Sequence, residues 1–176
     1  MTAVEFVLDG LLLVVVSIAA VSDVRKHTIP DWLTLPAMLL GLGARFFFYG
    51  MGGAFGLGLS SALFGLGVCF LIFGLFMVWG RGMGGGDVKL MMAVGAMVGF
   101  RQSLTWMMCA GIVGAVLALI LVVFKGRVLA TAKGIWLQFY QQGDEVSVAK
   151  VTLPYGVAIA IGGMWATAIK YGFLGF

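Results

Sequence analysis

Charged residues are scarce in this chain. They make up 10% of its 176 residues, whereas hydrophobic residues make up 62%. A soluble domain of this length has no need of so much apolar surface. Apolar stretches of roughly 20 residues recur instead, which is the length that crosses the hydrocarbon core of a bilayer as a helix. The stretches are continuous and do not alternate apolar with polar residues, which excludes a membrane β-barrel. The sequence therefore predicts an all-α, polytopic membrane protein.

Histidine and cysteine are also rare. His27 is the single histidine, which excludes a histidine-based metal cluster and argues against a nucleophilic triad. Cys69 and Cys109 are the two cysteines, and they lie far apart inside apolar stretches with no Cys-x-x-Cys motif. We interpret both as buried, unreactive thiols. We therefore expect neither a metal site nor a cofactor.

A basic patch is missing as well. The 11 Lys and Arg residues are scattered singly, so the net charge of +4 indicates membrane topology and not nucleic-acid binding. The first residues carry Glu5 and Asp9 where a secretory signal peptide would carry Lys or Arg. We expect the first apolar stretch to be a retained membrane span.

Six spans are expected in a single integral-membrane domain that covers 1–176. Their expected ranges are 4–21, 32–49, 55–79, 88–100, 104–124 and 153–173. The fourth span is short for a full crossing, so the glycine-rich stretch before it is expected at or within the membrane boundary. The longer polar segment 125–152 is expected to be a cytoplasmic loop, which either lies on the membrane surface or docks the substrate.

The loop charges predict the orientation. Loops after the first, third and fifth spans hold eight basic residues, and the other side holds three: Arg45, Arg101 and Lys170. By the positive-inside rule the first set is cytoplasmic. Asp23 and Asp87 follow the first and third spans, so both are expected on the cytoplasmic side at a similar depth. Ionisable residues at such a depth are costly and mark a functional site.

Two carboxylates that converge can divide acid and base roles. The neighbouring like charge favours protonation of one of them and leaves the other ionised. Such a pair can activate a water molecule and protonate a leaving amide nitrogen. An alternative remains open, in which Asp23 and Asp87 bind or relay ions in a small channel or transporter subunit.

Glycines surround the second aspartate, in the stretch Gly82-Met83-Gly84-Gly85-Gly86-Asp87. Because glycine has no Cβ, Gly84, Gly85 and Gly86 can adopt positive φ and let a substrate peptide approach closely. In the alternative interpretation the stretch is a flexible turn, and Asp87 caps the helix that follows.

Three blocks of the chain resemble the type IV prepilin peptidases, aspartic proteases of the membrane. The blocks are Ser22-Asp23-Val24-Arg25 with Ile29-Pro30-Asp31, then Gly84-Gly85-Gly86-Asp87-Val88-Lys89-Leu90, then Leu153-Pro154-Tyr155-Gly156-Val157-Ala158. The resemblance implies a Gly-x-Gly-Asp aspartic protease that cleaves the leader of prepilins and pseudopilins at the cytoplasmic face of the inner membrane. At matching positions it makes Asp23 and Asp87 the catalytic pair.

Departures from the family pattern narrow the resemblance. Larger members carry an additional methyltransferase domain with paired Cys-x-x-Cys motifs, which this sequence lacks. It is similar to the short, peptidase-only kind that serves tight-adherence (Flp) pili (TadV/CpaA-like). Asp31 stands where members often have Asn. We expect Asp31 to cap the second helix, although a third carboxylate near the site could take the first catalytic role.

Two cations complete the predicted substrate site. Lys89 could stabilise ionised Asp87 or contact substrate, and a role as a snorkelling topology residue is equally consistent with its position. Arg25 could orient Asp23, or serve only to keep its loop inside. We place both with Gly84, Gly85 and Gly86 as candidate substrate-binding residues.

Overall fold

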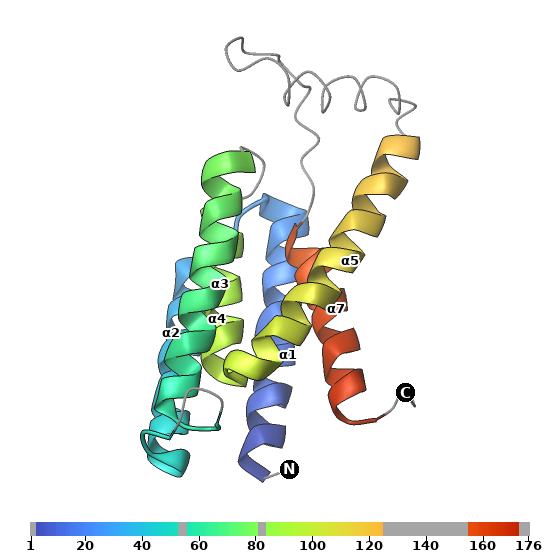
Figure 1. Cartoon of the computed structure of the whole chain (residues 1–176). Helices are drawn as coiled ribbons and strands as arrows, with labels where there is room; N and C mark the ends of the chain where they lie inside the picture. The colour runs from blue at the N-terminus through green and yellow to red at the C-terminus, as the bar shows by residue number, and fades with distance from the viewer. Residues whose placement is uncertain (1–2, 53–55, 81–83, 125–154, 173–176) are drawn as a thin grey trace.

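The structure, a computed structural model, describes residues 3–52, 56–80, 84–124 and 155–172. These residues form six helices and no strand. The helices, labelled as in Figure 1, are α1 (Ala3–Lys26), α2 (Asp31–Tyr49), α3 (Leu59–Gly80), α4 (Gly85–Val98), α5 (Phe100–Phe124) and α7 (Tyr155–Lys170). The predicted all-α fold is confirmed, and the predicted loop 125–152 lies outside the described residues.

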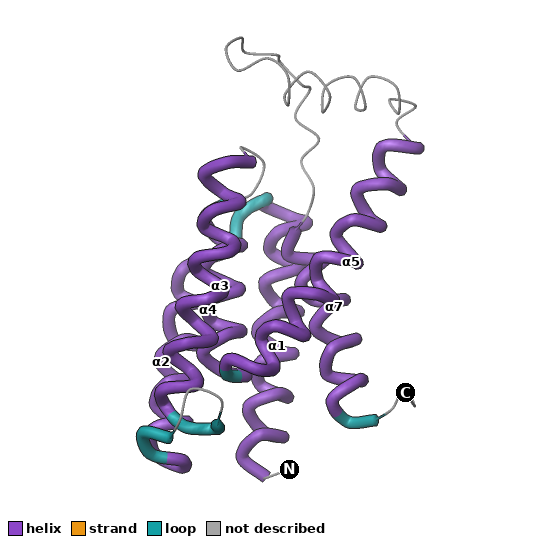
Figure 2. The backbone as a smooth tube through the Cα atoms, in the orientation of Figure 1, coloured by secondary structure: helices purple, strands orange, loops and turns teal. Residues whose placement is uncertain are grey.

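Successive helices run up and down in one bundle (Figures 1 and 2). The ends of α1, α3 and α5 and the beginnings of α2, α4 and α7 lie toward the upper end of the bundle in Figure 1. The upper end therefore gathers the N-termini of three helices, where backbone N–H groups lack partners within their own helix. Both predicted catalytic aspartates lie on helix turns at this end.

Four of the described helices, α1, α2, α3 and α5, are long and apolar enough to cross a membrane. Large apolar side chains on their outer faces are exposed, among them Phe47 (83%), Val78 (76%) and Leu119 (66%). Such surface suits lipid, which does not penalise exposed hydrocarbon. The chain is thus a polytopic helical membrane protein, and α4 and α7 are its shorter described helices, with 14 and 16 residues.

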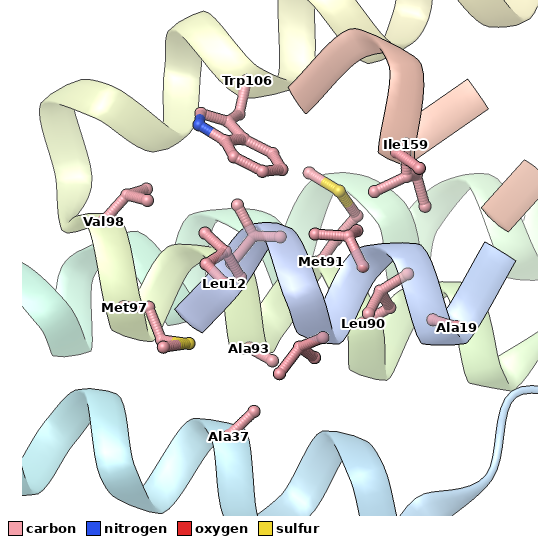
Figure 3. Packing of buried hydrophobic residues seen from close by; sticks show 14 of the residues in the cluster. Leu12, Ala19, Ala37, Leu90, Met91, Ala93, Met97, Val98, Trp106 and Ile159 are labelled. Atoms are coloured by element: carbon pink, nitrogen blue, oxygen red, sulfur yellow. The ribbon is translucent and has the colours of Figure 1, made fainter. Parts of the chain in front are cut away.

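The short helix α4 lies at the centre of the bundle. It packs against α1, α2, α3, α5 and α7. Figure 3 shows side chains of α4, among them Leu90 and Met91, between Leu12 of α1 and Ile159 of α7. Ten of the 14 residues of α4 are buried. A helix enclosed in this way is hydrophobic on all sides, and this explains why residues 90–98 of α4 form an uninterrupted apolar stretch.

Glycines bring two neighbours unusually close to α4. A Cβ on Gly95 would collide with the carbonyl oxygen of Gly65 on α3. A Cβ on Gly41 of α2 would lie 2.8 Å from the backbone nitrogen of Met97. Small residues permit this backbone-to-backbone packing in membrane proteins. The glycines at these positions therefore serve the packing of α4.

Several predicted helix boundaries were wrong by a few residues. Helix α1 continues to Lys26, five residues beyond the predicted end, because the polar residues that end its apolar stretch do not break a helix. Helix α4 begins at Gly85 and not at Val88, and α5 begins at Phe100 and not at Leu104. Helix α3 begins at Leu59, after a loop in which Gly52 and Gly58 pack together.

Charged side chains are also buried at the end of the bundle opposite the two aspartates. The guanidinium of Arg45 donates hydrogen bonds to the carbonyl oxygens of Met97 (3.0 Å) and Leu57 (2.7 Å). It thereby places a positive charge at the C-terminus of α4, where the helix dipole favours it. On the far side of the bundle, Asp9 of α1 pairs with Lys170 of α7 at 2.5 Å.

Candidate active site

Asp23 lies on the last full turn of α1. Its carbonyl oxygen accepts a hydrogen bond from the N–H of His27 (2.8 Å), and His27 adopts a positive φ of 49° that ends the helix. The carboxylate of Asp23 is only 8% exposed and points toward α7, where its Oδ2 accepts the N–H of Gly156 at 2.8 Å. The helix thus holds Asp23 more firmly than the predicted loop would.

Asp87 lies on the first turn of α4 and is 7% exposed. Its Oδ2 accepts a hydrogen bond from the N–H of Gly84, three residues earlier, at 3.2 Å. Asp87 therefore does cap its own helix, as one of the two interpretations expected. This contact uses only one oxygen. Oδ1 of Asp87 is fully buried and accepts no hydrogen bond from the residues that the structure describes.

The two aspartates line the same cleft, of about 200 Å³, at the upper end of the bundle. The other residues that line it come from the segment between α1 and α2 and from the start of α4: His27, Thr28, Ile29, Asp31, Gly84, Gly85 and Gly86. The two carboxylates lie close enough for the charge of each to act on the other. No Lys or Arg lines this cleft within the described part of the chain.

A pair of buried carboxylates without a cation is costly when both are ionised. Like charges that share a site are relieved when one of them takes a proton. In a cleft that no described lysine or arginine lines, a shared proton is one way to lower the charge. The geometry therefore favours one ionised and one protonated carboxyl group, side by side and open to a small molecule such as water.

Asp31 and Lys89 form an ion pair at the edge of the cleft. The Lys89 Nζ lies 2.7 Å from both carboxylate oxygens of Asp31, and both side chains are about half exposed. The prediction that Asp31 caps α2 was wrong, since the cap position is Pro30 and no side chain bonds to it. The ammonium of Lys89 bonds to Asp31 and not to Asp87.

Arg25, the cation that was predicted to orient Asp23, lies outside the cleft. Arg25 is exposed on the last turn of α1 and does not line the cleft. Neither Arg25 nor Lys89 therefore lines the cleft that holds Asp23 and Asp87. Gly84, Gly85 and Gly86 do line it.

The glycines before Asp87 do not use the positive φ that glycine permits. Gly84 is extended, with φ of −77°, and Gly85 and Gly86 belong to α4. Gly86 serves close packing, because a Cβ on it would lie 3.0 Å from the Cβ of Ile29, in the segment after α1. Gly86 thereby allows the segment that follows Asp23 to lie directly against the turn that carries Asp87.

Gly156 was not among the predicted site residues, although its N–H contacts Asp23. The signal was present in the third block of the resemblance, which contains Tyr155-Gly156 but has no chemically reactive side chain. A search for functional side chains overlooks a residue that acts through its backbone.

A comparison with known protein families matches residues 10–119 to the type IV leader peptidase family. The chain belongs to this family. The matched range contains both aspartates and the glycine block, and it ends before α7. Membership agrees with the resemblance that the three sequence blocks suggested.

A curated relative extends the match. The chain is 30% identical over 166 residues to a prepilin leader peptidase/N-methyltransferase of Xanthomonas campestris pv. campestris, and the match covers 88% of this chain. It covers 48% of the relative, so the chain spans about half the length of that protein. No solved structure matches the chain.

Proposed function

We propose that this chain is a membrane aspartic endopeptidase that cleaves the leader peptide of type IV or Flp-type prepilins. The observation that carries the proposal is the convergence of Asp23 and Asp87, 64 positions apart in the chain, in one cleft that no lysine or arginine of the described residues lines. Membership of the type IV leader peptidase family and the similarity to a prepilin leader peptidase support the substrate class.

The chemistry needs both carboxyl groups in different states. The ionised carboxylate takes a proton from a water molecule, and the water oxygen forms a bond to the carbonyl carbon of the scissile peptide. The protonated carboxyl group then gives its proton to the leaving nitrogen as the C–N bond breaks. The pair ends with one proton again, so no metal or cofactor is consumed or required.

The substrate in this proposal is a membrane protein with a short basic leader, a glycine before the cut and an apolar helix after it. The cleft lies at the end of the bundle, where such a helix would enter the bilayer. Gly84, Gly85 and Gly86 would receive the extended backbone around the cut. Lys89 and Arg25, both outside the cleft, would act on flanking parts of the leader.

The proposal places the cleft at the cytoplasmic face of the inner membrane of a prokaryote. The excess of basic residues in the loops on this side supports the orientation.

The test is cleavage of an Flp-type prepilin by the purified chain in lipid vesicles. We expect shortening at the glycine that ends the leader, without inhibition by a chelator. A soluble unfolded peptide without the apolar helix should be a poor substrate. Intact prepilin in this assay, together with ion flux that depends on Asp23 and Asp87, would overturn the proposal in favour of a channel.

A further inference from the structure

The contact between α1 and α7 at the cleft involves a backbone group. Gly156 is the second residue of α7, so its N–H has no acceptor within that helix. It donates instead to Oδ2 of Asp23, 133 positions away in the chain. A Cβ on Gly156 would lie 3.0 Å from both Cβ and Oδ2 of Asp23, so a residue with a side chain would disturb this approach.

The same two helices are joined by a second polar contact at the other end of the bundle. Asp9 of α1 accepts hydrogen bonds from Lys170 of α7 (2.5 Å) and from the hydroxyl of Tyr171 (2.9 Å). The side chains of Asp9 and Lys170 are 6% and 13% exposed. A buried pair of this kind is most consistent with setting the register of two elements.

The two contacts have matched spacing. Asp9 and Asp23 are 14 positions apart on α1, and Gly156 and Lys170 are 14 positions apart on α7. Fourteen residues make almost four helical turns, or about 21 Å, so both contacts lie on nearly one face of each helix. The ion pair at one end thus fixes the axial position of α7 that brings the Gly156 N–H to Asp23.

We propose that Gly156 is a positioning residue for the aspartate pair, and that the contact of Asp9 with Lys170 and Tyr171 sets the helix register that this role needs. The inference rests on the proposed peptidase function and deepens it. The N–H of Gly156 holds Oδ2 of Asp23, while Oδ1 of Asp23 accepts no hydrogen bond from the described residues. Oδ1 is then the oxygen left for the water molecule.

The titratable group that the N–H of Gly156 contacts is Asp23. The other titratable groups around it are Asp87 from α4, Asp31 from α2, Tyr155 from α7 and His27. All four are unchanged when Gly156 is replaced, so a change in pH profile would report on the contact itself.

The kinetic test is Gly156→Ala, measured as prepilin cleavage in vesicles. The added methyl displaces the Asp23 carboxyl group, and we expect kcat to fall about tenfold or more with KM within about twofold. The pH profile should also differ from that of the wild type, because the substitution displaces one carboxyl group of the pair. The thermal unfolding midpoint should change little.

Two matched glycine variants serve as controls. A Cβ on Gly114 of α5 would make an ordinary contact of 3.7 Å with Ala158 of α7, so Gly114→Ala should leave kcat unchanged. A Cβ on Gly162 would lie 2.5 Å from the backbone of Ala110, so Gly162→Ala should lower stability and activity together. Gly156→Ala behaving like either control would overturn the positioning role.

A spectroscopic test is independent of catalysis. The full chain, labelled with ¹⁵N-glycine in detergent micelles, should show one amide signal that is missing in Gly156→Ala. We expect this signal to move with pH in the wild type and to stop moving in Asp23→Asn. A Gly156 signal that titrates equally in Asp23→Asn would overturn the inference. If the wild type cleaves no prepilin, the proposed function fails, but this measurement still decides the contact.

Discussion

The two ends of the bundle treat buried charge in opposite ways. At the end that holds Arg45 and Asp9, each buried charge has partners of complementary sign or polarity: two carbonyl oxygens for Arg45, and Lys170 with Tyr171 for Asp9. At the cleft end two buried carboxylates line one cleft, and no lysine or arginine of the described residues lines it. Buried charges with partners are typical of structural contacts, whereas two like charges that share a site perturb each other's ionisation, which is typical of a functional site.

Lys89 lies near the cleft, but it pairs with a carboxylate outside the predicted catalytic pair. Lys89 is two residues from Asp87, yet its ammonium pairs with the half-exposed Asp31. Had Lys89 paired with Asp87, that carboxyl group would remain ionised and could not act as an acid. In the structure the ammonium of Lys89 pairs with Asp31 and not with Asp87.

The largest effect is expected at the unpaired carboxylates. Asp23→Asn and Asp87→Asn should each reduce prepilin cleavage by about 10³-fold or more, and the double variant should be no worse than either single one, because the pair acts as a unit. The measurement is the initial rate of leader removal in vesicles. Activity that survives Asp87→Asn would contradict a catalytic role for the carboxylates at the cleft end.

A large loss of stability is expected at the paired end. Lys170→Met leaves the charge of Asp9 buried without its cation, which costs about 3–5 kcal/mol. The double variant Asp9→Leu/Lys170→Leu removes both charges and should regain most of that stability. Thermal unfolding in detergent measures both. The double variant should still cleave several-fold more slowly than the wild type if this contact sets the register of α7.

An intermediate effect is expected where the glycine block packs against the segment after α1. Gly86→Val places a side chain against Ile29 and should lower cleavage about 10- to 100-fold while the protein remains inserted in the membrane. Gly43→Val on α2 is the matched control, since nothing lies within 4 Å of its Cβ position. Equal activity in the two variants would leave Gly86 without a role at the cleft.

The smallest effect is expected at the exposed ion pair. Lys89→Met should change stability by about 1 kcal/mol or less, because both side chains are about half exposed and solvent screens their attraction. Asp31→Asn should change cleavage less than about threefold. A dead Asp31→Asn enzyme alongside an active Asp23→Asn enzyme would move the first catalytic role to Asp31.

The sequence predicted the parts of this arrangement that follow from local pattern. Apolar stretches placed the helices, and loop charges with the Gly-x-Gly-Asp motif placed Asp23 and Asp87 at one end. Contacts between distant positions could not be predicted in this way. The Lys89–Asp31 pair joins positions 58 apart and the Gly156–Asp23 contact joins positions 133 apart, so both depend on how the helices pack.

Arg45 is a second case in which the sequence pattern could not show how a residue packs. The charge count treated it as a loop residue that reports on topology, but it is 2% exposed and bonds to backbone oxygens near the end of α4. A count of charges cannot tell a residue that faces water from one that caps a buried helix. The orientation it predicts rests on the remaining basic residues.

The central claim is that the cleft end relieves its charge by a shared proton and the other end by ion pairing. Infrared difference spectra between the wild type and Asp23→Asn/Asp87→Asn in vesicles test it directly. We predict a protonated carboxylic band in the wild type at the pH of full activity, absent in the variant and lost at higher pH in step with cleavage. Full cleavage activity at a pH where no such band exists would contradict the account.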